Sequence, residues 1–435
     1  MWICKEGCHF NDTQPTKALI VTVDSPLTPS FEREERMEEM RRLADTAGLL
    51  VVGELTQTRH SPDPKYFLGR GKIGDLESLR AETGAEIVIF DAELTPVQIR
   101  NIEDIVGARL ADRTQVILDI FAMRAATSEG KLQVELAQLL YALPRLRGRG
   151  VELSRLGGGI GTRGPGETKL ETDRRVIRRR IARLQKEIDA LKSRRGIQRL
   201  RRSTVPYPII ALVGYTNSGK STLLNALTHS SILAEDRLFA TLDPTVRRLH
   251  LPSGQTALLV DTVGFIRGLP HELVAAFRAT LEEVVEAGVL VHVVDSSNPS
   301  YKAQMEVVSG LLESLSVETR PTVLAFNKSD VCRVPDSELE GYKPAVRISA
   351  LSGEGLDSLL ATIDRCLETD RLEFVFTLPY SKQSLLPVMY ENGKVKLVRY
   401  GEESIVVTAE LPGVCARRIR EELRDDGACA RGVET

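Results

Sequence analysis

The sequence predicts a multidomain α/β protein with a phosphate-binding domain in its second half. Three observations support this fold class. Residues 17–125 alternate between strand-like and helix-like segments, residues 126–203 carry two heptad-like apolar stripes, and a glycine-rich loop follows an apolar run at 214–221. The expected parts are an N-terminal α/β region at 1–125, a basic helical hairpin at 126–203, a phosphate-loop domain at 204–368 and a small α+β domain at 369–435.

The composition is that of a globular protein. Of 435 residues, 42% are hydrophobic and 27% are charged, and the net charge is −2. No run of about 18 uncharged apolar residues occurs, and the N-terminal MWICKEGCHF lacks the apolar core of a signal peptide. The six cysteines are scattered, which favours free thiols, and Cys4, Cys8 and His9 lack the second half of a metal-binding pattern. We therefore expect a monomeric cytoplasmic protein without a transmembrane segment, with partial membrane association as the alternative.

The first region has the pattern of a small parallel α/β domain. The runs KALIVTVD, GLLVVGEL and EIVIFDA are strand-like, whereas FEREERMEEMRRLADTAG and TPVQIRNIEDIV have helical spacing. Strands that alternate with helices favour a mainly parallel sheet. The G-x-G-x-x-G at Gly69, Gly71 and Gly74 follows a polar, proline-containing stretch, so we expect a turn and a helix start there rather than a second nucleotide site.

The second region has two helical stripes whose members are three or four residues apart. They are Leu132, Leu136, Leu139 and Leu143, then Ile177, Ile181, Leu184, Ile188 and Leu191. Such stripes predict an antiparallel hairpin. From Arg145 to Arg202 the chain carries 19 Lys+Arg and 6 Asp+Glu, so these residues contribute +13 and the other 377 contribute −15. This block predicts a polyanionic partner, either nucleic acid or an anionic membrane, with a solvated helix face as the plainer alternative.

The loop between the two helices contains eight glycines between Gly148 and Gly166. Glycine at this density cannot form a stable helix and allows close approach of the backbone to another surface. Basic residues surround it, at Arg145, Arg147, Arg149, Arg155, Arg163 and Lys169. We interpret the loop as an arginine-rich probe on a helical stalk, with a flexible linker as the alternative.

The sequence GYTNSGKS matches the phosphate loop G-x-x-x-x-G-K-[ST]. The strand-like PIIALV precedes it and the helix-like STLLNALT follows it. Backbone N–H groups of such a turn converge on phosphate oxygens, and the helix start adds positive partial charge. We expect Lys220 to reach the β- and γ-phosphates and the Ser221 hydroxyl to bind Mg²⁺. The predicted contacts are Gly214, Tyr215, Thr216, Asn217, Ser218, Gly219, Lys220 and Ser221.

Two later motifs favour GTP over ATP. NKSD follows the strand-like TVLAF, 107 residues after Lys220, where ligands of open α/β sheets bind. A carboxylate at Asp330 can accept hydrogen bonds from N1–H and the 2-amino group of guanine, and adenine would leave it unsatisfied. SAL follows the strand-like AVRI and fits the last guanine-contacting loop. The predicted base contacts are Asn327, Lys328, Ser329, Asp330, Ser349, Ala350 and Leu351.

Two further segments fit the nucleotide-sensing switches of a GTPase. DTVG follows the apolar run TALLV and FATLD precedes it. Thr241 is the candidate for a second Mg²⁺ ligand beside Ser221, and Thr245 is the alternative. The predicted switch contacts are Phe239, Ala240, Thr241, Leu242, Asp243, Asp261, Thr262, Val263 and Gly264.

One position departs from the common GTPase pattern. Phe265 stands where many GTPases have a glutamine that orients the attacking water. Phenylalanine cannot make that hydrogen bond, so we expect slow intrinsic hydrolysis that is assisted by K⁺ bound at Asn217 or by a binding partner. The candidate catalytic residues are Lys220, Thr241, Gly264 and Asn217.

The last region, residues 371–435, alternates between the strand-like LEFVFTLP, KVKLVRY and ESIVVTAE and the helix-like YSKQSLLPVMYENG and ARRIREEL. Two consecutive strands in this β-α-β-β-α order predict a small α+β module.

On these residues the chain resembles the HflX family of bacterial translational GTPases. The similarity covers nearly the whole chain and includes LVVGELTQTRHSPDPKYFLGRGK, RLGGGIGTRGPGETKLETDRR, FATLDPT and DTVGFIRGLP. The resemblance implies a P-loop Ras-like GTPase domain with an N-terminal α/β subdomain, a helical hairpin and a small C-terminal α+β domain. It implies binding to the large ribosomal subunit and its rRNA, with the glycine–arginine loop near the peptidyl transferase region, and GTP-dependent dissociation of stalled or stressed ribosomes. Within this family Phe265 is normal, and the family is reported to bind ATP through its N-terminal region, which the residues here support weakly.

Two other functions stay open at this point. A GTPase that assists tRNA modification or ribosome assembly is one, although no second active site is apparent. A nucleotide-gated adaptor at anionic membranes is the other, although the apolar stripes are narrow and suit helix packing better than membrane insertion.

Overall fold

The computed structural model describes residues 15–145, 165–202, 207–228, 238–239, 241, 243–268, 282–317, 319–369, 371–412 and short pieces within 416–432. The chain forms two compact units. The first contains Met1–Lys192, Glu235–Asp243 and Ile266–Thr280, and the second contains Ser193–Ala234, Pro244–Phe265 and Leu281–Thr435.

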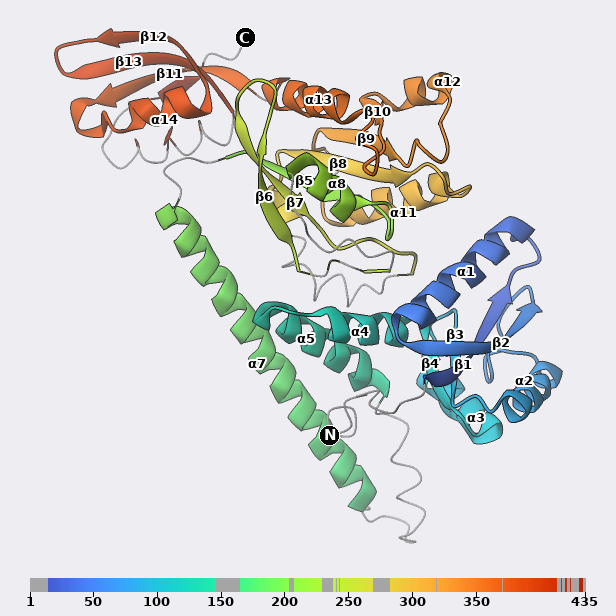
Figure 1. Cartoon of the computed structure of the whole chain (residues 1–435). Helices are drawn as coiled ribbons and strands as arrows, with labels where there is room; N and C mark the ends of the chain where they lie inside the picture. The colour runs from blue at the N-terminus through green and yellow to red at the C-terminus, as the bar shows by residue number, and fades with distance from the viewer. Residues whose placement is uncertain are drawn as a thin grey trace. The chain divides into compact units, whose positions relative to one another are not determined.

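The first unit begins with a parallel four-stranded sheet, as expected (Figure 1). Its strand order is β2-β1-β3-β4, and the strands are β1 (Thr16–Asp24), β2 (Leu49–Thr58), β3 (Ile87–Phe90) and β4 (Arg109–Asp112). The helices between them are α1 (Ser30–Thr46), α2 (Arg70–Thr83) and α3 (Pro96–Val106). Apolar side chains of these strands and helices form one buried core. Strand β4 was not anticipated because RLAD is short and has no apolar run.

The glycine motif at residues 69–74 is a turn and a helix start, as expected. Helix α2 begins immediately after Gly69, whose N–H donates a hydrogen bond to Gln57 Oε1 at 2.8 Å. Gly71 and Gly74 lie in the first turns of α2.

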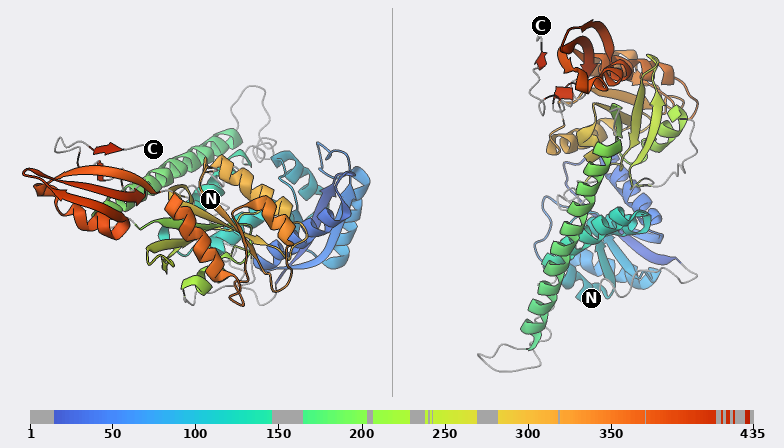
Figure 2. Two further views of the ribbon diagram at one scale, coloured as in Figure 1. Left: turned by 90° about the horizontal axis from the view of Figure 1, so that it is seen from above. Right: turned by 90° about the vertical axis from the view of Figure 1, so that its left-hand side faces the viewer.

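The predicted helical hairpin is present. Helices α4 (Arg113–Arg124) and α5 (Ser128–Arg145) lead to the long helix α7 (Pro165–Arg202) (Figures 1 and 2). Both predicted stripes meet in one apolar cluster, made by Leu136 and Leu139 of α5 with Ile181, Leu184 and Ile188 of α7. Arg180 of α7 also binds both carboxylate oxygens of Glu135 of α5, at 2.7 and 2.8 Å.

The glycine-rich loop lies outside the described residues, except for its last two positions at the start of α7, and so do Cys4, Cys8 and His9. Arg145 at the edge of this loop corrects one expectation. Its guanidinium stacks on the Tyr141 ring at 3.5 Å and pairs with Asp112 Oδ2 at 3.1 Å. Arg145 therefore fastens the end of α5 to β4 instead of serving as a probe.

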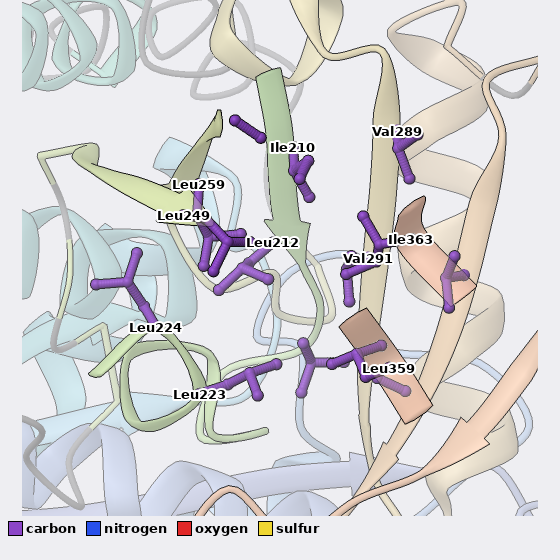
Figure 3. Packing of buried hydrophobic residues seen from close by; sticks show 14 of the residues in the cluster. Ile210, Leu212, Leu223, Leu224, Leu249, Leu259, Val289, Val291, Leu359 and Ile363 are labelled. Atoms are coloured by element: carbon purple, nitrogen blue, oxygen red, sulfur yellow. The ribbon is translucent and has the colours of Figure 1, made fainter. Parts of the chain in front are cut away.

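The second unit is built on a six-stranded sheet of order β10-β9-β8-β5-β7-β6 in which only β6 is antiparallel to its neighbour. Its strands are β5 (Ile209–Val213), β6 (Thr245–His250), β7 (Thr256–Asp261), β8 (Val289–Asp295), β9 (Thr322–Asn327) and β10 (Ala345–Arg347). Its helices are α8 (Lys220–Thr228), α10 (Glu282–Glu286), α11 (Tyr301–Ser314), α12 (Asp336–Leu339) and α13 (Leu356–Thr369). Figure 3 shows how Leu223 of α8 and Leu359 and Ile363 of α13 pack with strand residues in the core.

A second sheet in this unit forms the C-terminal module. It is antiparallel, of order β12-β13-β11-β14. Its elements are β11 (Arg371–Pro379), α14 (Leu385–Asn392), β12 (Lys394–Tyr400), β13 (Ser404–Pro412) and β14 (Ala430–Gly432). The three expected strands are present and β14 was not expected. Among the helices of the described residues, none is long and apolar enough to cross a membrane.

Candidate functional site

The phosphate loop lies between β5 and α8, at the carboxyl edge of the sheet. Its shape depends on glycine at Gly219, which has φ 92° and where a Cβ would lie 2.3 Å from Asn327 Nδ2. Asn217 also has a left-handed backbone, with φ 62°. Asparagine tolerates this conformation better than most residues, so the shape of the loop is by itself a sufficient reason for asparagine here.

Lys220 is the first residue of α8 and is buried. Its Nζ donates hydrogen bonds to the carbonyls of Gly214 at 3.1 Å and Tyr215 at 2.8 Å. Burial lowers the pKa of Lys220 to about 8, and the nearby Asp261 carboxylate opposes this shift. The ammonium is therefore held inside the loop in an environment that favours a bound anion.

Hard oxygen ligands stand beside this lysine. Ser221 Oγ donates to Asp261 Oδ2 at 2.6 Å, and Asp261 is almost fully buried at the end of β7. A hydroxyl next to a buried carboxylate is the donor set that Mg²⁺ prefers, so these residues fit the metal.

Two buried hydroxyls of the loop have no hydrogen-bond partner in the described part of the chain. They are Thr216 Oγ1 and Ser218 Oγ, in residues that are 7% and 0% exposed. Leaving a buried polar group unsatisfied costs about 1–3 kcal/mol. Unsatisfied hydroxyls in the loop are consistent with a site that binds a polar ligand.

The DTVG segment is fastened directly to the phosphate loop. Thr216 N–H donates to the Phe265 carbonyl at 2.7 Å, and Phe265 N–H donates to the Gly214 carbonyl at 3.0 Å. A Cβ at Gly264 would lie 2.9 Å from Thr216 Cα and 3.1 Å from Lys220 Nζ, so glycine permits this close approach. The Phe265 side chain is buried, which keeps it away from a role in water orientation.

Thr262 does not offer its side chain to a nucleotide in this structure. It is fully buried, and its Oγ1 donates to the Leu212 carbonyl of β5 at 2.6 Å. Val263 is also buried, beside Gly264.

Asn327 ties the predicted base-binding loops to the phosphate loop. Its Nδ2 donates to the Ser218 carbonyl at 2.8 Å, and its Oδ1 accepts from Ala350 N–H at 2.9 Å. Ser349 Oγ donates to Asp330 Oδ1 at 2.6 Å, which orients the exposed carboxylate that is predicted to read guanine. Ser329 lies buried beside them and Leu351 is exposed. Four separate stretches of sequence therefore meet at one edge of the sheet.

Asp295 was not among the site residues predicted from the sequence. This residue ends β8, and its Oδ2 pairs with Lys328 Nζ at 2.6 Å. The position of Asp295 immediately after the apolar run VLVHVV was the available signal, because carboxyl ends of parallel strands converge on the ligand.

The other predicted switch segment belongs to the first unit. Phe239, Thr241 and Asp243 are described there, whereas Ala240 and Leu242 lie outside the described residues. The Phe239 ring packs on Phe121 of α4, and the Asp243 carboxylate accepts hydrogen bonds from residues just before α5. Both side chains are thus engaged by the protein itself.

Comparisons with known proteins match this arrangement. Four family models cover consecutive stretches: "GTP-binding GTPase N-terminal" matches residues 34–122, "GTP-binding GTPase Middle Region" 124–202, "50S ribosome-binding GTPase" 209–328 and "HflX C-terminal domain" 337–423. A "GTPase HflX" of Caldanaerobacter subterraneus is 47% identical over 92% of this chain and 92% of its own. The chain belongs to the HflX family. A further member, from Escherichia coli K12, is 41% identical over 88% of this chain and 92% of its own.

A solved structure has a similar chain. It is a GTP-binding protein of the archaeon Sulfolobus solfataricus in complex with GDP, 26% identical, with a TM-score of 0.43 over 81% of this chain and 98% of that one. The family membership and the P-loop domain identify this HflX protein as a GTPase that binds and hydrolyses GTP.

Proposed function

We propose that this HflX GTPase binds the large ribosomal subunit in its GTP-bound state, dissociates stalled or stressed ribosomes, and is released after hydrolysis. The family model that matches residues 209–328 describes a 50S ribosome-binding GTPase, which supports the choice of partner. Binding to ribosomes would make the protein cytoplasmic, and we expect it to act as a monomer.

The proposed nucleotide contacts are residues 214–221, 239–243, 261–264, 327–330 and 349–351. Thr262 and Asp243 would contribute through their backbone, because their side chains bind other parts of the protein. Lys220 would bind the β- and γ-phosphates, and Asp330 would accept hydrogen bonds from guanine. Ser221 and Thr241 would hold Mg²⁺, which supplies positive charge that neutralises the phosphates. The short Ser221–Asp261 contact and the buried, unsatisfied hydroxyls of Thr216 and Ser218 support this assignment.

The basic surface of α7 supports binding to ribosomal RNA. Its exposed cations are Arg175, Arg178, Arg179, Arg183 and Lys186. Among the described residues, Arg175, Arg179 and Lys186 make no ion pair, whereas Arg183 pairs with Glu187. The apolar stripe of the same helix packs on α5, so the basic surface is available to rRNA phosphates and the apolar stripe is not available to a lipid bilayer.

The test is cosedimentation with large ribosomal subunits, in a non-hydrolysable GTP analogue or in GDP, over a series of salt concentrations. We expect binding that depends on the analogue and weakens steeply as salt rises, because each phosphate neutralised contributes about −0.7 to −0.9 to the log–log slope. Equal binding in GDP would contradict a nucleotide-controlled interaction. Sucrose gradients of intact ribosomes with the same nucleotides then test dissociation.

A matched pair of variants tests the surface. The charge-reversed variant R175E/R179E/K186E should bind at least about tenfold more weakly and show a shallower salt slope, since about three phosphate contacts are lost. The charge-conserving variant R175K/R179K should retain most of the binding. Both should hydrolyse GTP normally without ribosomes. Undiminished binding by the reversed variant, or strong flotation with anionic vesicles, would favour another partner.

We also propose that K⁺ bound near Asn217 assists hydrolysis, since Phe265 cannot orient water. The amide oxygen of Asn217 suits a hard monovalent ion. Hydrolysis should then be faster in KCl than in NaCl at equal ionic strength, and the N217A variant should lose this difference. Equal rates in the two salts would remove K⁺ from the proposal and leave activation to the ribosome.

A further inference from the structure

The segment with the candidate Mg²⁺ ligand Thr241 is held by the helices that lead into the hairpin. Its described residues are Leu238, Phe239, Thr241 and Asp243. The segment Glu235–Asp243 is part of the first unit, although the chain before and after it belongs to the second. The contacts of Phe239 and Asp243 that are described below lie within the first unit.

Asp243, from a distant part of the chain, binds the two residues that precede α5. Its Oδ2 accepts hydrogen bonds from the N–H groups of Ala126 at 3.1 Å and Thr127 at 2.9 Å, and its Oδ1 accepts from Thr127 Oγ1 at 2.5 Å. Thr127 Oγ1 accepts in turn from Gly130 N–H at 2.9 Å. A carboxylate at a helix start is favourable because the first N–H groups lack partners within the helix.

The other end of the segment is held by an aromatic contact. The Phe239 ring meets the Phe121 ring edge to face, with centroids 4.7 Å apart, and both side chains are buried. Phe239 also has φ 56°, a conformation that packing must sustain in a residue with a bulky side chain. Thr241 lies two residues from each of these attachments.

Gly130 lacks the side chain that would collide with the Asp243 carboxylate. A Cβ on Gly130 would lie 2.6 Å from Asp243 Oδ1, so any larger residue would push the carboxylate away. Alanine is otherwise the better residue inside a helix, so the absence of a side chain serves the contact with Asp243.

We propose that Asp243 is a positioning residue for GTP hydrolysis: its hydrogen bonds to Ala126 and Thr127 fix the position of Thr241, two residues before it, for its role as a Mg²⁺ ligand. This inference rests on the proposed role of Thr241 as a Mg²⁺ ligand. In this role the Asp243 carboxylate would act through Thr241, because it is itself bound to Ala126 and Thr127.

The test measures the GTP hydrolysis rate of the full chain as a function of Mg²⁺ concentration, together with GDP affinity. The D243A variant should show about tenfold lower kcat and require more Mg²⁺ for half-maximal rate, because a displaced ligand costs catalysis without removing the binding site. GDP affinity should not change. The D243N variant keeps an oxygen acceptor and should be intermediate.

The D75A variant serves as the control. It removes an exposed carboxylate of α2, paired only with Lys72 at 3.1 Å among the described residues, and should behave like the unchanged protein.

A second route tests the same contact from the opposite side. The G130A variant should reproduce the Mg²⁺ shift of D243A without removing any polar group. The double variant D243A/G130A should be no worse than either single variant, because both changes break one contact. Additive effects would overturn the proposal, since they would mean that the two positions act separately.

The T241A variant separates this inference from the proposed function. If T241A is impaired but D243A has normal kcat and Mg²⁺ dependence, the positioning role is wrong and the Mg²⁺ ligand stands. If T241A hydrolyses GTP normally with unchanged Mg²⁺ dependence, the ligand assignment fails and the positioning role fails with it. Impairment of both variants with a common Mg²⁺ shift supports the proposal.

Discussion

The parallel four-stranded sheet and the mainly parallel six-stranded sheet use their carboxyl edges differently. At the edge of the first sheet, Asp24 and Asp112 end strands β1 and β4, and Asp91 follows strand β3. Arg36 pairs with Asp24 at 3.0 Å and Asp91 at 2.8 Å, and Arg145 pairs with Asp112 at 3.1 Å. The edge of the second sheet has the phosphate loop with its buried ammonium and unsatisfied hydroxyls.

This difference separates a structural edge from a ligand-binding edge. Both positions suit a ligand in a parallel α/β fold. The first edge satisfies its own charges, whereas the second leaves polar groups for a bound nucleotide. The carboxylates at the strand ends have protein partners at both edges, so the difference lies in the buried ammonium of Lys220 and the unsatisfied hydroxyls of Thr216 and Ser218.

Among the predictions, the largest effect is the loss of stability expected when Arg113 is removed from the edge of the first sheet. Its guanidinium is buried and pairs with Asp91 at 2.7 Å and with Glu39, and its Nε donates to the Arg267 carbonyl at 3.1 Å. The R113M variant should destabilise the first unit by about 3–5 kcal/mol, because two carboxylates lose a buried partner. Hydrogen exchange of the β1 and β3 amides measures this loss. The R41M variant removes an exposed, paired arginine and should cost no more than about 1 kcal/mol; equal losses would contradict the comparison.

Removal of Lys220 tests whether the edge of the second sheet serves to bind the nucleotide rather than to stabilise the fold. The K220M variant should bind GTP about 100-fold more weakly, equivalent to about 3 kcal/mol, since charge-assisted hydrogen bonds to phosphate are lost. Its free energy of unfolding should not fall, because burial of the ammonium opposes folding. Calorimetric titration with GTP and a urea unfolding curve measure the two quantities. The K302M variant, on the exposed face of α11, serves as the control and should bind normally.

The lowered pKa of Lys220 makes GTP affinity depend on pH. Below about 8 the lysine of the free protein is charged; above this value binding must take up a proton, because phosphate raises the pKa again. Affinity should fall by up to about tenfold per pH unit above 8. The free energy of unfolding should instead rise with pH between pH 8 and pH 10.5, since Lys220 of the unfolded chain binds more protons in this range than the buried lysine does. Calorimetry at pH 9 in buffers of different ionisation enthalpy measures the uptake, which the K220M variant should lack.

The smallest predicted effect concerns Ser349. Its hydroxyl orients Asp330, so the S349A variant should lose about 1 kcal/mol of GTP binding, roughly fivefold, with less preference for GTP over ATP. Competition binding with the two nucleotides measures this. The S352A variant, in the same loop, should bind as before. An unchanged preference in S349A would mean that Asp330 is held by other contacts.

Much of the architecture was predictable because it is local. The period-two and period-3.6 patterns indicated strands β1 to β3 and both hairpin helices, and the phosphate loop needs only contiguous residues. Strand β4 was not predicted because the sequence RLAD has no strand-like pattern of apolar residues. Its pairing with β3 depends on the tertiary structure. Asp295 was not predicted, although it directly follows the apolar run VLVHVV; only its pairing with Lys328, 33 residues away, depends on the fold.

The sequence by itself determined the parallel α/β regions, the hairpin seam and the chemistry of the nucleotide loops, because spacing and residue type are sufficient for these. Only the tertiary structure decided which charges are already neutralised. Arg145 has the same chemistry as Arg175, yet one is stacked on Tyr141 and paired with Asp112, and the other is exposed. The physical reason is that an ion pair depends on the distance in space between two groups, and separation along the chain does not encode that distance.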